Sequence, residues 1–299
     1  MSRAFGGLRR FLSTTFGEPL GSRIDPTGVR GYYVDLSVKA SDSARPPDGG
    51  LPAAVCQWGL GAFERHLAGE DGTWLAAAVS SGEWLLREQS LSGSDEGGWV
   101  HHQPMPHTFP LDPPWLSGLA QGQGASLLVR LHLETGRGEF AEAAKRALLP
   151  LAVPSGEGGV KALLDGHPFP EEYPTDPPSF VLNGAIFALF GCHDVAAGLG
   201  DEEAGKTFRD GAAALAASLD RWDTGYWSRY DLYPHPLANV SSAAYHRLHI
   251  DQLTALHMLA PHPEFAETAT RFERYRASRR ARARAFAAKA AFRLRVPRR

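Results

Sequence analysis

The strongest constraint on the fold is a series of helical patterns that come in pairs. In each pattern the apolar residues recur at the spacing of one helix face. The patterns span residues 51–67, 74–89, 115–134, 138–149, 177–191, 201–219 and 245–259, and a last one begins at Glu264. Short turns join the members of a pair, and long loops separate the pairs. This order predicts a mainly α fold and favours an α/α barrel, a ring of helical hairpins with a cleft at one end, over a helical bundle without a cleft.

Composition divides the chain into three parts. Residues 1–50 are rich in Gly, Pro, Arg and Ser and include one strand-like run, Tyr32–Val38, so they predict a short irregular or β-containing arm. Residues 51–275 hold the helical patterns and form the predicted barrel domain. Residues 276–299 are predicted to be a basic helical tail that continues the last helix.

Two loops of the barrel domain, Ser90–Pro114 and Pro154–Asp176, are longer than the connections usual in compact domains. Loops of this length are often functional, so we expect them to contribute to a site.

The tail accounts for an uneven distribution of charge. The net charge is −2, but residues 271–299 hold eleven Arg and Lys289 against a single acidic residue. One interpretation is a solvated helical extension. The other is contact with a membrane surface or an anionic polymer, with Phe286, Phe292 and Leu294 as apolar positions. We expect no nucleic-acid partner, because the tail contains no recognisable reading motif.

The number of cysteines and the distribution of apolar residues indicate where in the cell the protein is expected. Cys56 and Cys192 are the only cysteines, too few for a disulfide framework. No uninterrupted apolar run is long enough to span a membrane, and the N-terminal residues are too broken by Arg and Gly to be a signal peptide. We therefore expect a cytoplasmic protein, peripheral to a membrane if the tail binds one.

Three short clusters contain residues that can carry protons. They are Glu171–Thr175 with Asn183 behind it, Tyr226–Tyr233, and Tyr245–Gln252. Four of the eight tyrosines lie from position 226 to position 245, beside carboxylates and histidines. This density suits a sugar site, because tyrosine offers both an aromatic face and a transferable proton. For any single tyrosine, the alternative is a loop residue that only packs.

Other chemistries have less support from the residues. His246 and His249 lie three positions apart on a predicted helix, but no carboxylate stands at a recognised ligand spacing, so we expect no metal. The Gly-rich stretches lack the strand-then-helix context of a phosphate loop, and a GxSxG nucleophile motif is absent. We also expect no cofactor.

Several sequence motifs follow one another in a fixed order. Residues 171–184 are EEYPTDPPSFVLNG, residues 223–232 contain DTG and then YDL, and residues 245–253 contain YH and then HIDQL. Upstream, WLLREQ at 84–89 precedes GGW at 97–99, and AQGQ at 120–123 precedes LVR at 128–130. Over residues 50–275 this series resembles the D-glucuronyl C5-epimerase family, whose members convert glucuronate to iduronate within heparosan-type chains.

The resemblance implies an α/α barrel whose cleft holds the catalytic residues. Glu172 would be the base that removes the C5 proton, and Tyr245 the acid that returns a proton from the other face. Tyr173 and Tyr230 would line the same site, and Asn183 would contact the sugar carboxylate. The resemblance also implies a homodimer that acts on a uronate-containing oligo- or polysaccharide.

Further candidate substrate-binding residues come from the same motifs. Tyr233 stands where an Arg follows YDL in the family, so Arg229 or Arg247 is expected to supply a cation instead. The other candidates are Trp99, Gln121, Gln123, His246 and His249. About fifty residues precede the predicted barrel, whereas the animal enzymes carry a β-rich region there, so a shorter or different uronate glycan stays open as the substrate.

The implied reaction places two demands on the site. The C5 proton is α to a carboxylate, and its removal builds up negative charge that the site must neutralise or hydrogen-bond. Two proton carriers must flank C5 on opposite faces, for which a buried Glu with a raised pKa and a Tyr with a lowered pKa are suited. Two alternatives remain open: a polysaccharide lyase, which removes the same proton and expels the C4 substituent, and a non-catalytic glycan-binding barrel.

Overall fold

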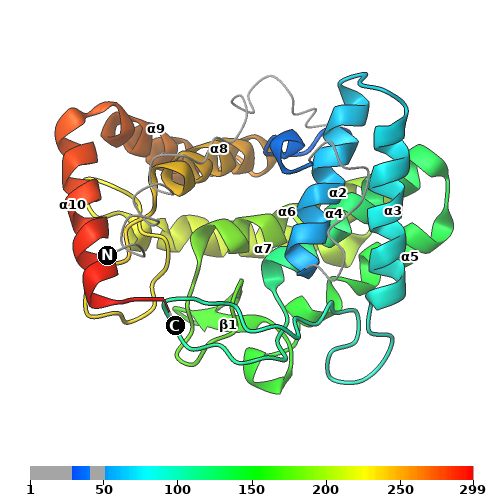
Figure 1. The fold of residues 1–299 in the computed structure, drawn as a ribbon, viewed down its shortest axis with the longest axis horizontal. Helices are drawn as coiled ribbons and strands as arrows, with labels where there is room; N and C mark the ends of the chain where they lie inside the picture. Colours follow the sequence, from blue (N-terminus) through cyan, green and yellow to red (C-terminus); the bar gives the residue numbers. More distant parts are fainter. Residues whose placement is uncertain (1–28, 41–50, 299) are drawn as a thin grey trace.

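The computed structural model describes residues 29–40 and 51–298, which are mainly helical (Figure 1). The α-helices are α2 (Pro52–Leu67), α3 (Thr73–Glu88), α4 (Gly118–Thr135), α5 (Gly138–Arg146), α6 (Leu182–Leu199), α7 (Glu202–Ser218), α8 (Ala243–Leu259), α9 (Pro263–Ala277) and α10 (Arg279–Arg295). Short 3₁₀ turns are η2 (Ser37–Lys39), η3 (Leu149–Leu151), η4 (Ser155–Glu157) and η5 (Leu219–Trp222). In the described residues the strands are β1 (Lys161–Leu164) and β2 (His167–Pro170), an antiparallel hairpin in the second long loop, where no strand was predicted. The predicted mainly α class is confirmed.

Consecutive helices pack as hairpins, as their paired patterns predicted. The pairs are α2 with α3, α4 with α5, α6 with α7, and α8 with α9, and the first helices of the pairs are neighbours in the order α2, α4, α6, α8. These first helices form an inner layer, since α4 is buried without a break from Gly118 to Leu131 and α6 from Leu182 to Cys192. The second helices, such as α9, bury one side only. Closure of the row into a complete barrel stays a prediction.

Small residues allow the inner helices α4 and α6 to lie close together. A Cβ atom on Gly122 would collide with the backbone oxygen of Phe187, and one on Gly191 would lie 2.5 Å from the Cα of Gly122. Glycine weakens a helix by roughly 1 kcal/mol relative to alanine, and the close approach of the two backbones compensates for this loss. By length and composition α6 is apolar enough to cross a membrane, but 72% of it is buried inside the protein, as in a core helix.

The described part of the N-terminal arm packs on the inner helices as irregular chain. The run Tyr32–Val38 forms no strand and leads into the η2 turn, so the strand-like interpretation is wrong there. Tyr33 donates a hydrogen bond of 2.6 Å to Asp194, which also forms a buried ion pair of 2.6 Å with Arg130. These contacts with α4 and α6 take the place of a strand partner. The remaining residues of the arm lie outside the described residues.

Helix α6 begins later than the sequence predicted. The Asp-Pro-Pro sequence suggested a helix from residue 177, but α6 starts at Leu182. The helix starts late because the Glu171 carboxylate accepts hydrogen bonds of 2.8 Å each from the backbone N–H groups of Ser179 and Phe180. These contacts hold the chain before α6 as a loop around a buried carboxylate.

The basic tail is a separate helix and not a continuation of α9. Ser278 ends α9, and its hydroxyl caps α10 by accepting the N–H of Ala281 at 3.3 Å. One face of α10 packs on the protein through Ala285 and Phe292, both fully buried. The tail is therefore not a wholly solvated extension, and Phe292 is not one of its outward apolar positions.

Candidate active site

Three segments that lie far apart in the sequence meet at the N-terminal ends of the inner helices. They are the loop before α6, the segment that follows η5, and the first turn of α8. Backbone hydrogen bonds join the first two: Leu182 donates to the Tyr230 oxygen at 3.2 Å, and Leu232 donates to the Ser179 oxygen at 2.9 Å. The structure thus brings together the three clusters that the sequence analysis singled out.

Two neighbouring glutamates in the loop before α6 have different surroundings. Glu171 is fully buried and accepts hydrogen bonds from the Ser179 hydroxyl at 2.6 Å and from two backbone N–H groups. Burial raises the pKa of Glu171 to about 7, although these hydrogen bonds act in the opposite direction. Both oxygens of the Glu171 carboxylate accept hydrogen bonds from the loop before α6. Glu171 therefore has a structural role.

Glu172 lies against the first turn of α6, with its carboxylate in contact with the predicted site residues. The carboxylate accepts a hydrogen bond of 3.2 Å from the side-chain amide of Asn183 and another from the Tyr173 hydroxyl. Gly184 leaves room for it, because a Cβ at that position would collide with the Glu172 side chain. Burial raises the pKa of Glu172 to about 8, as expected for a general base.

Three tyrosines continue from Glu172 as a series of contacts. The Tyr230 hydroxyl donates to the Tyr173 oxygen, and the Tyr173 hydroxyl donates to Glu172. The ring of Tyr245 meets that of Tyr230 edge-on, with 5.1 Å between the ring centroids. Burial raises the pKa of Tyr173 and Tyr230, whereas Tyr245 is 36% exposed. The four residues predicted to be catalytic therefore form one cluster, the catalytic cluster below, buried at Glu172 and open at Tyr245.

Aromatic residues from the first long loop, and Trp115 just after it, cover this cluster. The ring centroids of His107, Phe109 and Trp115 lie 4.7, 5.3 and 5.6 Å from that of Tyr173. Tyr233, a predicted binding residue, packs on Phe109 at 5.4 Å. Such aromatic faces suit stacking on a sugar ring. The length of the loop was the only signal in the sequence for His107 and Phe109. Trp115 was predicted to begin a helix, but α4 starts at Gly118, so Trp115 lies in the chain before the helix.

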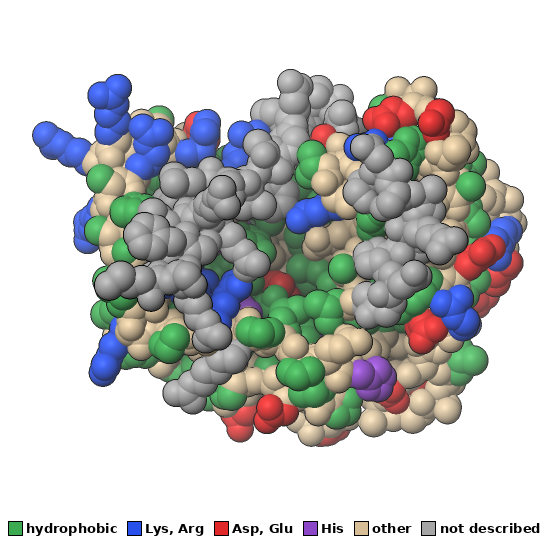
Figure 2. All heavy atoms as spheres, in the orientation of Figure 1, with side chains coloured by type: hydrophobic (Ala, Val, Ile, Leu, Met, Phe, Trp, Pro, Cys, Tyr) green, Lys and Arg blue, Asp and Glu red, His purple; other side chains and the backbone are tan. Residues whose placement is uncertain are grey.

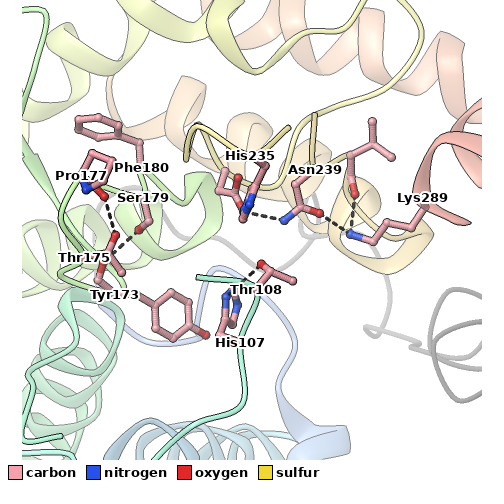
Figure 3. A network of polar contacts seen from close by, with 12 residues as sticks. His107, Thr108, Tyr173, Thr175, Pro177, Ser179, Phe180, His235, Asn239 and Lys289 are labelled. Atoms are coloured by element: carbon pink, nitrogen blue, oxygen red, sulfur yellow. Dashed lines mark hydrogen bonds and ion pairs between the residues drawn. The ribbon is translucent and has the colours of Figure 1, made fainter. Parts of the chain in front are cut away.

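The molecular surface is hollowed on this side. Figure 2 shows a depression near the centre of the face, lined mainly by hydrophobic side chains, with Lys and Arg side chains on the side of α10. Figure 3 shows Tyr173 beside His107, and facing them a row formed by His235, Asn239 and Lys289.

His246 and His249 hold the segment after η5 against α8 and α9. His246 stacks on Trp227 with 3.7 Å between the ring centroids, and its ring nitrogens contact the Ser228 hydroxyl at 2.8 Å and the Phe272 oxygen at 3.0 Å. His249 contacts the same hydroxyl at 2.9 Å. Burial lowers the pKa of both histidines. Through these contacts the two histidines hold the backbone beside the site in position.

Three further binding candidates, Trp99, Gln121 and Gln123, lie in the helical core. The Gln121 amide donates to two backbone oxygens at 3.0 and 2.8 Å, and its oxygen accepts from the backbone N–H of Trp99 at 3.1 Å. The Trp99 indole donates to the Leu85 oxygen at 2.8 Å. Gln123 is buried beside Tyr32 of the arm. The structure does not bring these three residues to the catalytic cluster.

The two arginines expected to supply a cation have other surroundings. Arg247 pairs with Asp251 at 2.9 Å on α8, close to Glu273 of α9. Arg229 lies near Arg221, and burial lowers its pKa. None of the contacts of the described residues joins either arginine to the catalytic cluster.

The arrangement defines a class of site. A buried carboxylate with a raised pKa contacts a series of tyrosines, and aromatic rings on a scaffold of helical hairpins cover them, as suits proton transfer on a sugar. Within the described ranges, no group of three or more His, Cys, Asp or Glu side chains could hold a metal ion.

Comparison with known proteins places the chain more narrowly. Residues 93–274 match the family described as D-glucuronyl C5-epimerase C-terminus, and the chain belongs to this family. A D-glucuronyl C5-epimerase of Caenorhabditis elegans is 30% identical over 223 residues, which cover 69% of this chain and 36% of the nematode protein. An uncharacterized protein of Methanocaldococcus jannaschii is 27% identical over 132 residues, 42% of each chain. The matched residues thus span less than half the length of either relative.

Proposed function

We propose that this chain is a uronic acid C5-epimerase, which inverts C5 of glucuronate residues in a glycan to give iduronate. The observation that carries the proposal is the contact series from the buried Glu172 carboxylate through Tyr173 and Tyr230 to the half-exposed Tyr245. Membership of the D-glucuronyl C5-epimerase family supports the same reaction class.

The first half of the proposed reaction is proton removal. Glu172 takes the proton from C5, and the electron pair of the C–H bond moves into the adjacent carboxylate to give an enolate-like species. The raised pKa of Glu172, about 8, narrows the gap between this base and a very weak carbon acid. The Asn183 amide, which contacts Glu172 at 3.2 Å, is close enough to hydrogen-bond the sugar carboxylate as well.

The second half is proton return from the opposite face. Tyr245 donates its hydroxyl proton to C5, the electron pair returns from the enolate to form the new C–H bond, and the configuration at C5 is inverted. Glu172 then holds a proton and Tyr245 lacks one. The hydroxyls of Tyr173 and Tyr230 lie between them, so they offer a route for the proton that restores the starting state.

The substrate of this proposal is a glycan that contains glucuronate, bound with its reacting sugar among the aromatic rings of the first long loop. A homodimer, implied by the family resemblance, is the assembly that we propose. Sedimentation velocity of the full chain would test the assembly, and a monomer at all concentrations would contradict it.

The deciding experiment is solvent deuterium incorporation at C5 of glucuronate-containing oligosaccharides, followed by NMR. We expect label at C5 together with new iduronate signals, and loss of both in the Glu172→Gln variant. Glu157, exposed on η4, gives the matched control, since Glu157→Gln should exchange like the wild type. Unsaturated sugar ends would identify a lyase instead, and binding without label would identify a glycan-binding barrel.

A further inference from the structure

The segment that carries Tyr230 is held on two sides by other parts of the chain. On one side the Tyr230 oxygen accepts the backbone N–H of Leu182, at the start of α6, at 3.2 Å. On the other side the Tyr230 N–H donates to the Asn239 oxygen at 2.7 Å. An antiparallel bridge between Arg229 and Val240 continues this pairing. The position of the middle tyrosine of the series therefore depends on Asn239 and Val240.

The side chain of Asn239 is bonded at both of its ends. Its oxygen accepts a hydrogen bond of 2.8 Å from the ammonium group of Lys289, on α10 (Figure 3). Its nitrogen donates a hydrogen bond of 2.6 Å to the Asp231 carboxylate. An ammonium group only donates and a carboxylate only accepts, so these two partners determine which way the amide points. Asn239 and Asp231 are both buried, where the loss of a hydrogen bond is costly.

Lys289 makes a second contact with the same stretch of chain. Its ammonium group also donates to the backbone oxygen of Val240 at 2.7 Å. One side chain of α10 thus bonds the two successive residues that pair with the Tyr230 segment. Ala285 and Phe292, four positions before and three positions after Lys289, are fully buried and hold this face of α10 against the protein.

A residue that only fastened α10 to the protein would not need an amine. Burial lowers the pKa of Lys289 to about 7, and Asp231 is the neighbouring charge that acts in the opposite direction. A leucine or methionine would pack at such a position without the cost of removing a charge from water. The fold therefore keeps an amine in a costly environment, next to the two oxygens that it bonds.

We propose that Lys289 is a positioning residue of the active site, which fixes Tyr230 within the tyrosine series through its hydrogen bond to Asn239. This inference rests on the proposed function, since it takes the tyrosine series to be the route of the proton. Proton transfer depends closely on geometry, and a displacement of about 1 Å can slow a reaction on the order of 100-fold. Lys289 lies outside residues 93–274, so α10 completes the site from beyond the part that matches the family.

The contacts of Lys289 also predict which kinetic constant depends on it. Within the described residues, its ammonium group bonds Asn239 and Val240 and lies 5.5 Å from the ring of Phe292. None of these residues belongs to the catalytic cluster, so removing the ammonium group takes no side chain of the cluster away from the substrate. It changes how firmly Tyr230 is held. The expected loss is therefore in the rate of proton transfer and not in the affinity for the glycan.

Steady-state kinetics of C5 deuterium exchange by the full chain, on a glucuronate-containing hexasaccharide, test this role. Lys289→Met keeps the shape of the side chain without its charge, and we expect kcat to fall at least about tenfold while KM stays within about twofold of the wild type. Two controls lie at exposed positions of α10: Arg282→Met removes the same charge, and Ala287→Gly weakens the helix. Both should keep kcat within about twofold of the wild type.

A second measurement reports on Tyr230 without turnover. With ¹³C at Cζ of every tyrosine, NMR of the full chain gives a signal for each of the eight tyrosines, and Tyr230→Phe and Tyr32→Phe identify two of them. In Lys289→Met we expect the Tyr230 signal to shift and that of Tyr32, which packs on α6, to stay in place. Lys289→Gln keeps a donor but sets it one bond further from both oxygens, and we expect the same direction of change if Lys289→Met does not fold.

The outcomes separate this inference from the proposed function. A wild type without C5 exchange, together with a Tyr230 signal that shifts in Lys289→Met, would end the epimerase proposal and sustain the placement of Tyr230 by Lys289. Normal exchange by the wild type with an unchanged kcat in Lys289→Met would end the positioning role and leave the epimerase. An unmoved Tyr230 signal would overturn that role whether or not the wild type is active. So would an equal fall in kcat in Ala287→Gly, which would follow from loosening α10 as a whole, or a raised KM at unchanged kcat, which would make Lys289 a glycan-binding residue.

Discussion

Replacing Glu172 with Gln tests the catalytic assignment through stability as well as activity. Glutamine keeps the shape of the side chain and can still accept the hydrogen bond from Asn183, but it cannot exchange a proton. In the wild type, burial raises the pKa of this carboxyl from its ordinary 4.5 to about 8, because burial disfavours the charged form. The fold therefore favours a neutral side chain at the position where the proposed chemistry needs a carboxylate.

The raised pKa sets how the stability depends on pH. Because the pKa of Glu172 is higher in the folded chain, its contribution to stability is fully present below pH 4.5 and is lost as the pH rises through about 8. A difference of one in pKa corresponds to about 1.4 kcal/mol, so the upper limit of the loss is about 5 kcal/mol. Glutamine does not titrate. The variant should therefore be more stable than the wild type by about 1 kcal/mol at pH 5, about 3 kcal/mol at pH 7 and nearly the full limit at pH 9.

Urea unfolding at these three pH values, followed by circular dichroism, measures the difference. The control Glu157→Gln should stay within about 0.5 kcal/mol of the wild type throughout, because the side chain is exposed. A Glu172→Gln variant whose gain is the same at pH 5 and pH 9 would refute the argument that burial destabilises the carboxylate. Retained C5 exchange in that variant would refute its role as the base.

Three further substitutions test the cluster, the packing against it, and the ion pair beneath the N-terminal arm. Tyr245→Phe keeps a half-exposed ring, so we expect an unchanged melting temperature and a fall in C5 exchange of at least about 100-fold; exchange near the wild-type rate would exclude this tyrosine as the acid. Gly184→Ala places a Cβ against the Glu172 side chain, which should slow exchange and cost about 1–3 kcal/mol of stability in urea unfolding; normal kinetics would contradict the packing. Arg130→Met leaves Asp194 as an unpaired buried charge and should lower the free energy of unfolding by about 3–5 kcal/mol. Adding Asp194→Leu should recover part of this loss, and an unchanged melting temperature in Arg130→Met would disprove the ion pair.

The helices could be predicted from the sequence because their signal is local. Apolar spacing predicted residues 51–67 and 74–89, and the structure has helices over Pro52–Leu67 and Thr73–Glu88. The start of α6 could not be predicted in the same way. It depends on the carboxylate of Glu171, a loop contact that the local sequence pattern does not reveal.

The catalytic cluster and the core glutamine Gln121 came from the same kind of motif, yet the structure gives them different surroundings. A motif combines residues that contact a substrate with residues that only hold the fold. The contacts separate them: the side-chain amide of Gln121 is satisfied by backbone groups, whereas Glu172 lies among other titratable side chains. His107 is the opposite case, a residue of the cluster's cover without any sequence motif to mark it.

The spacing of residues in the tail indicates a helix with one buried face, but the arginine-rich composition drew attention away from it. Ala285, Lys289 and Phe292 stand four and three positions apart, which places them on one helix face. The many arginines around them suggested either a solvated helix or contact with a membrane surface or an anionic polymer. The spacing indicates instead a helix with one buried face, and the Ser278 cap gives that helix a start of its own.

The gradient of burial across the cluster separates the two halves of the proposed reaction. Glu172 is buried, and there a low dielectric environment raises its pKa and brings its basicity closer to what C5 demands. Tyr245 is 36% exposed, so its hydroxyl can exchange protons with water between turnovers. Backbone hydrogen bonds between the loop before α6 and the Tyr230 segment hold the intervening tyrosines in place. A proton that passes from Glu172 along these tyrosines to Tyr245 can therefore exchange with water before Tyr245 returns a proton to C5, which accounts for the label expected at C5.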